Sequence, residues 1–78
     1  MEEIMCVDMI VDGVKDFIDK IVAIQSATEE SLSIYILNED GIGYSYRKFT
    51  EFDSYHIYLK NKDGSRTSYR EVTRMGGE

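Results

Sequence analysis

Hydrophobic and polar residues alternate along much of the chain, and this alternation is typical of β-strands. The stretch 4–11 is almost continuously apolar, so a strand there would be covered on both faces. Three further stretches alternate and predict strands at 31–37, 42–49 and 55–60, and the hairpin turn at 61–64 predicts a last strand at 65–72. Turn signals at 38–41 and 61–64 join these strands in pairs, which must therefore be antiparallel.

The segment that follows the first strand has a different period. Its apolar residues recur at the spacing of one buried helical stripe: Val14, Phe17, Ile18, Ile21 and Val22. Asp12 is a good N-cap residue, and Asp16 would lie near the positive end of the helix dipole. The pattern predicts a helix that starts at Asp12-Gly13 and ends between Gln25 and Thr28.

The expected order of elements is β-α-β-β-β-β, an α+β fold with one helix packed on a mostly antiparallel sheet. Residues 1–73 would form a single domain, and residues 74–78 a flexible C-terminal tail. One helix covers only one face of the sheet. The other face would expose apolar and aromatic side chains: Ile4, Cys6, Ile10, Tyr35, Leu37, Phe49 and Tyr58.

An exposed apolar face of this size usually marks an interface. The sequence therefore predicts a homodimer, formed face to face or by pairing of edge strands. The residues expected to contact a partner or a second copy are Tyr35, Leu37, Phe49 and Tyr58. A strongly curled sheet that buries both of its faces is the alternative.

Composition narrows the class of protein further. The chain has 78 residues, enough for one domain, and its single cysteine, Cys6, excludes an intramolecular disulfide and indicates a reducing compartment. The first residues are acidic, and Asp8 interrupts the apolar stretch, so neither a signal peptide nor a membrane span is expected. We therefore expect a cytoplasmic protein that does not bind membranes.

No motif in the sequence indicates catalysis or a cofactor. The single His56 and Cys6 are far apart in the chain, and no phosphate-binding or nucleophile-elbow motif occurs. The turn at 38–41 resembles a calcium loop only weakly, because the alternating acids and the late glutamate are missing. We expect no enzyme, no metal site and no cofactor.

The last residues carry one resemblance. Gly76-Gly77 is similar to the diglycine of ubiquitin-like carriers, which is activated and conjugated. The resemblance covers those residues alone. The β-grasp fold of these carriers places a hairpin before its helix, whereas a single strand is expected here.

Charge is distributed unevenly. Residues 1–40 hold ten acidic and two basic residues, a net charge of −8, whereas residues 41–78 hold five acidic and seven basic residues, a net charge of +2. The overall charge of −6 disfavours direct contact with nucleic acid. We interpret the basic residues of the last hairpin as charges that protect an edge strand from aggregation.

The acidic half supplies the leading functional hypothesis. On the expected helix, Asp12, Asp16 and Asp19 would form one line of carboxylates, and further acids would extend it: Glu29, Glu30, Glu39 and Asp40. A rigid array of carboxylates can occupy a basic DNA- or RNA-binding site on another protein. Small acidic inhibitors of phages and mobile elements, some of them DNA mimics, resemble this design in size and charge. A soluble, salt-bridged helix (Asp16 with Lys20, Lys15 with Asp19) and an adaptor that binds through its aromatic sheet face remain alternatives.

Overall fold

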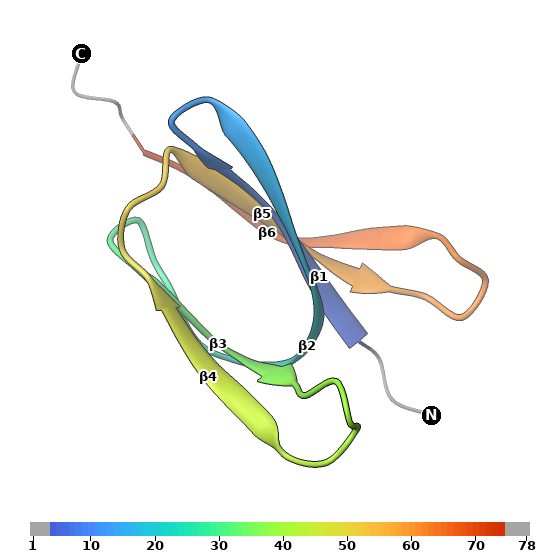
Figure 1. Cartoon of the computed structure of the whole chain (residues 1–78). Helices are drawn as coiled ribbons and strands as arrows, with labels where there is room; N and C mark the ends of the chain where they lie inside the picture. Colours follow the sequence, from blue (N-terminus) through green and yellow to red (C-terminus); the bar gives the residue numbers. More distant parts are fainter. Residues whose placement is uncertain (1–3, 75–78) are drawn as a thin grey trace.

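A computed structural model describes residues 4–74, which form one six-stranded antiparallel sheet with the strand order β4-β3-β2-β1-β5-β6 (Figure 1). The strands have these bounds: β1 Ile4–Val11, β2 Val14–Ala27, β3 Leu32–Leu37, β4 Tyr44–Phe49, β5 Ser54–Lys60 and β6 Arg66–Thr73. Strands β1 to β4 form a meander. The chain then crosses to the far side of β1, where β5 and β6 complete the sheet.

The predicted helix is wrong, and with it the α+β fold class, because residues 4–74 contain no helix. The segment expected to be helical is mostly the long strand β2. Asp12 and Gly13 have φ values of 52° and 79°, and Val11 pairs directly with Val14. Two positive φ values in a two-residue loop are the requirement of a type I′ hairpin turn. Asp-Gly therefore turns the chain back into a strand and does not cap a helix.

Three bulges in β2 explain why its pattern resembles that of a helix. The register of β2 shifts once against β1, between Ile18 and Ile21, and twice against β3, at Ile21–Ala23 and Ile24–Ser26. Each bulge adds one residue to β2, so side chains on one face recur every three residues instead of every two. The side chains packed in or against the core are accordingly Ile18, Ile21, Ile24 and Ala27. A bulged strand thus acquires a period close to that of a helix.

The sheet curls so that its concave face holds one hydrophobic core (Figure 1). Bulges increase the twist and bend of a strand, and β2, at the centre of the curve, carries three of them. The core draws on five strands and on the connection between β4 and β5: Val7, Met9, Ile21, Leu32, Ile34, Phe52, Tyr55, Ile57 and Val72. No helix is needed because the sheet covers its own concave face.

Arg74 links two connections of the curled sheet, the β2–β3 turn and the β4–β5 connection. Its guanidinium group donates hydrogen bonds to the backbone carbonyls of Glu29, Glu30, Thr50 and Phe52 at 2.7–3.1 Å, and lies 4.2 Å from the centre of the Phe52 ring. These carbonyls belong to the β2–β3 turn and to the β4–β5 connection. Apart from Arg74, the expected tail 74–78, with Gly76-Gly77, lies outside the described residues.

Candidate interaction surface

The acidic residues expected to form one line do not share an element. Asp12 lies in the β1–β2 turn, Glu29 and Glu30 in the β2–β3 turn, and Glu39 and Asp40 in the β3–β4 turn. Three separate turns thus replace the predicted carboxylate line, because the helix that would have aligned it is a strand. The last of these turns has a fixed shape, since Gly41 donates to the Asn38 carbonyl and Ile42 donates to the Asp40 carboxylate at 2.8 Å.

Asp16 and Asp19 are also separated. Asp16 is exposed and lies opposite Met9 of β1. Asp19 lies beside the first bulge of β2, and both of its carboxylate oxygens accept hydrogen bonds from the Lys60 ammonium group at 3.1 Å. The helical pairs considered from the sequence, Asp16 with Lys20 and Lys15 with Asp19, are not among the ion pairs within residues 4–74.

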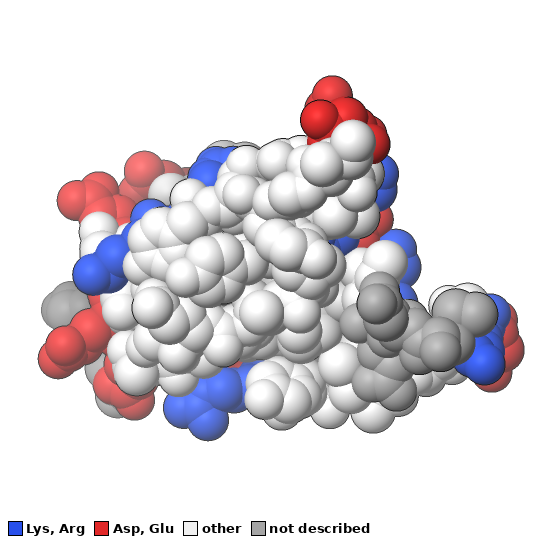
Figure 2. Space-filling view, turned by 90° about the horizontal axis from the view of Figure 1, so that it is seen from below, with Lys and Arg blue, Asp and Glu red and all other residues white. Residues whose placement is uncertain are grey.

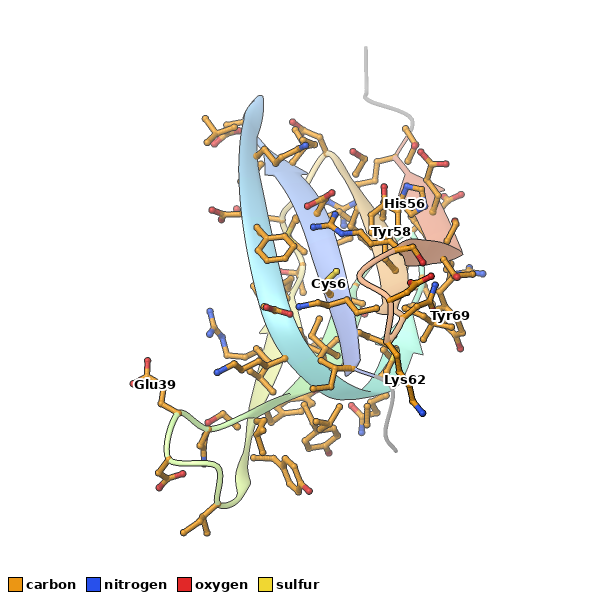
Figure 3. The ribbon with its side chains drawn as sticks, turned by 90° about the vertical axis from the view of Figure 1, so that its right-hand side faces the viewer. Cys6, Glu39, His56, Tyr58, Lys62 and Tyr69 are labelled. Atoms are coloured by element: carbon orange, nitrogen blue, oxygen red, sulfur yellow. The ribbon has the colours of Figure 1, made fainter. Side chains whose placement is uncertain are left out.

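The convex face of β1, β2, β5 and β6 carries a mixed cluster that brings the two halves of the chain together. The Arg66 guanidinium lies 5.3 Å from the Phe17 ring centre and 5.4 Å from that of Tyr58, and 3.8 Å from the Asp8 carboxylate. His56 stacks on Tyr58 (Figure 3). Acidic residues of the first half thus pair with basic residues of the second, which offsets part of the charge separation seen along the sequence.

Cys6 lies beneath this cluster. Its side chain is on the convex face of β1, opposite Tyr58, yet it is fully buried (Figure 3). Burial raises the pKa of the Cys6 thiol, and the nearby Arg66 lowers it in part. Burial likewise raises the pKa of Tyr55, whose hydroxyl donates a 2.7 Å hydrogen bond to the Thr28 carbonyl. Neither group is poised to react at neutral pH.

These two groups predict a loss of stability in alkali. A group whose pKa is raised on folding holds its proton more tightly in the folded state, so it stabilises fully below its unfolded pKa. For Cys6 and Tyr55 the ordinary values are 9.0 and 10.0, and the stabilisation is lost as the pH rises from there through the folded pKa. Urea unfolding from pH 7 upward should therefore show a falling free energy of unfolding above about pH 9. Cys6→Ala should flatten the first part of this fall and Tyr55→Phe the later part, whereas unchanged slopes in both variants would contradict the assignment.

The convex face of β3 and β4 carries two exposed tyrosines beside two partly buried apolar side chains. Tyr35 lies opposite Tyr46 with ring centres 5.3 Å apart, and Leu37 lies opposite Tyr44. We call these four residues the tyrosine face. Tyr44 is 62% exposed and Tyr46 47%. Figure 2, seen from the side on which β3 and β4 lie in Figure 1, shows a broad central area without charged side chains and Lys, Arg, Asp and Glu around its rim.

The four residues expected to form one contact face therefore separate. Tyr35 and Leu37 are on the tyrosine face. Phe49 lies opposite Leu32 and packs against the concave core, and Tyr58 belongs to the cluster around Arg66. Tyr44 and Tyr46 were absent from the expected set. The signal that identifies them is the β3–β4 turn, because pairing of Asn38 with Gly43 sets Tyr46 opposite Tyr35.

Strand β4 is also an edge of the sheet, and its free edge is regular. The Asn38 amide donates to the Gly43 carbonyl, and the β3–β4 register continues without a bulge. Because hydrogen-bonded pairs alternate in an antiparallel ladder, Ser45 and Arg47 bond to β3, while the backbone groups of Tyr44, Tyr46 and Lys48 point to the free edge. The other edge strand, β6, is interrupted by a register shift near Tyr58.

The His, Cys, Asp and Glu side chains of residues 4–74 do not cluster. Within that range, no group of three or more His, Cys, Asp or Glu side chains could hold a metal ion. The same residues include no helix with the length and apolarity needed to cross a bilayer. Comparison of the chain with protein-family models, with curated proteins and with solved structures finds no match.

Proposed function

We propose that this protein is a non-catalytic interaction module that binds another protein through the tyrosine face. The observation that supports this most directly is the exposure of Tyr44 and Tyr46 beside Tyr35 and Leu37 on one face of β3 and β4. Tyrosine is enriched among the residues that contribute most to binding, because it offers a large rigid area and a polar hydroxyl. Charged side chains at the rim would exclude mismatched partners.

The edge of β4 adds a second means of contact to the same surface. An extended segment of a partner can pair with the free backbone groups of Tyr44, Tyr46 and Lys48, and its side chains would then meet the tyrosine rings. Main-chain pairing supplies affinity and the side-chain contacts supply specificity. A reducing compartment suits this module, since Cys6 is a free thiol, and we place it in the cytoplasm.

An acidic inhibitor that occupies a basic nucleic-acid-binding site, including a DNA mimic of phage or mobile-element type, is the second proposal. It is supported by the exposed carboxylates that form no ion pair within residues 4–74: Asp12, Asp16, Glu29, Glu30, Glu39 and Asp40. The geometry favours it less, because these carboxylates are spread over three turns and one strand. A mimic of duplex DNA needs charge at regular, short intervals.

A capture experiment with paired variants separates the two proposals. The immobilised chain is exposed to bacterial lysate, washed in steps of rising salt, and the bound proteins are identified by mass spectrometry. For binding through the tyrosine face, the Tyr44→Thr/Tyr46→Thr variant should lose a partner that resists salt. The Asp12→Asn/Asp16→Asn/Glu39→Gln variant should keep that partner.

Tyr69→Thr is the matched control, because Tyr69 is a comparably exposed tyrosine (57%) on the other edge strand. It should bind as the unchanged chain does. The opposite pattern, in which the acidic variant alone loses a basic partner that elutes at moderate salt, would replace the first proposal with the second. A partner kept by all variants would exclude both surfaces.

A further inference from the structure

The structure points to a partner for the free edge beside the tyrosine face: we propose that a second copy of this chain binds there, by antiparallel pairing of β4 with β4 about a twofold axis. This inference rests on the proposed function, because it uses the same surface. The two edge strands each bear two basic residues, but β4 keeps a regular register with its neighbour, whereas β6 is interrupted by a bulge. A bulge is one of the means by which a sheet blocks pairing at an edge, and the register of β4 contains none.

A third free stretch, on β2 before Ile21, is no substitute. Strand β3 pairs with β2 only from Ile21 onward, which leaves Val14–Lys20 with one unpaired side. That stretch ends at the Asp19–Lys20 bulge, where Lys20 has a φ of 62°. A left-handed residue in the strand breaks the ladder that a second copy would need.

Symmetry and complete pairing of the free backbone groups together select the register of the β4 pair. A twofold axis perpendicular to the sheet keeps each side chain on its own face, so one residue must lie opposite its own copy. With Tyr46 on the axis, Tyr44 of each copy lies opposite Lys48 of the other, and the free backbone groups of Tyr44, Tyr46 and Lys48 are all paired. On the convex face this register places tyrosine against tyrosine at the centre and lysine against a tyrosine ring on either side.

Charge favours the same orientation. Glu39 and Asp40 precede β4, and Arg47 and Lys48 lie at its far end. In an antiparallel pair the acidic end of one copy lies beside the basic end of the other, whereas a parallel pair would set like charges side by side. The sheet would extend from six strands in one copy to a continuous sheet through both, with the tyrosine faces adjacent.

The test measures self-association of the full chain by sedimentation equilibrium from micromolar to millimolar concentration. We expect a dimer that dissociates on dilution. Tyr46→Lys should raise the dissociation constant by about tenfold or more, because it removes the tyrosine pair and sets two ammonium groups opposite each other. Tyr69→Lys is the control and should leave the dissociation constant unchanged, since Tyr69 lies on β6.

Mixing variants tests the register. Tyr46→Lys and Tyr46→Glu should each self-associate more weakly than the unchanged chain, and a mixture of the two should form a heterodimer more tightly than either forms a homodimer, because only a residue on the axis faces its own copy. Amide exchange adds a direct view of the edge: the Tyr46 amide should become protected as concentration rises. The Arg66 amide should stay unprotected, because Asn61 donates to Ser65 and this leaves Arg66 pointing to the free edge of β6.

Several results would overturn self-pairing: a monomer at every concentration, dissociation caused by Tyr69→Lys instead of Tyr46→Lys, or no heterodimer on mixing. None of these decides the broader proposal. A monomeric chain whose Tyr44→Thr/Tyr46→Thr variant loses a captured partner would retain the tyrosine face as a binding surface for a different protein. If the variants at Tyr44 and Tyr46 keep both self-association and the captured partner, the tyrosine face is excluded from both proposals.

Discussion

Replacing Arg74 by methionine is expected to lower the free energy of unfolding by about 3 kcal/mol, a large part of the stability of a domain this small. The guanidinium group donates to four backbone carbonyls and stacks on the Phe52 ring, so its removal leaves several acceptors without a donor at once. Three of the four hydrogen bonds are exposed, and water replaces part of what is lost, which keeps the cost below the sum of the separate bonds.

Two further variants make this measurement specific. Arg74→Lys should recover only part of the stability, because an ammonium group lacks the planar set of donors that reaches two elements together. Lys62→Met, in the exposed β5–β6 turn, should change the free energy of unfolding by no more than about 0.5 kcal/mol. Urea unfolding monitored by circular dichroism provides the values. If Arg74→Met and Lys62→Met lower the free energy of unfolding by the same amount, the hydrogen bonds of Arg74 do not stabilise the curled sheet.

The second large effect distinguishes a bulged strand from a helix. Ile21→Ala should lower the free energy of unfolding by about 2–5 kcal/mol, because Ile21 is fully buried on the concave face of the sheet. Val14→Ala should cost less than about 1 kcal/mol, because Val14 is 65% exposed at the start of β2. On a helix both residues would share one buried stripe, and both substitutions would lower the free energy of unfolding by a large amount. Similar large costs in the two variants, together with a helical circular dichroism spectrum, would contradict the all-strand fold.

The parts of the fold that the sequence predicts are those with a local cause. Alternation marks β3, β4 and β5 within a few residues of their ends, and the hairpin turn before it marks β6. Gly41 and Gly64 lie in the two turns, with φ values of 77° and 92°. The segment 12–28 fails because two signals compete there. Asp12-Gly13 is a strong hairpin turn, but the apolar spacing that follows matches a helix, and bulges cannot be recognised without the partner strands that define them.

The candidate surface depends on information of the same non-local kind. Alternation assigns Tyr35 and Phe49 each to a face of its own strand, but it does not say which face of β4 continues which face of β3. The length of the Asn38–Gly43 connection decides this and sets Phe49 opposite Leu32 in the core. Arg74 was assigned to a tail because its partners are backbone carbonyls 22–45 residues away, and no side-chain pattern reports on them.

The strand order has a consequence for the folding pathway. Of the ladders in the sheet, β1–β2, β2–β3, β3–β4 and β5–β6 join neighbours in the chain, and each of these hairpins can form without waiting for the rest. The β1–β5 ladder alone joins distant segments, so the entropy of loop closure is concentrated in that one step. We therefore expect the pairing of β1 with β5 to have the largest influence on the rate of folding, and the cooperativity of the whole domain to depend on that ladder.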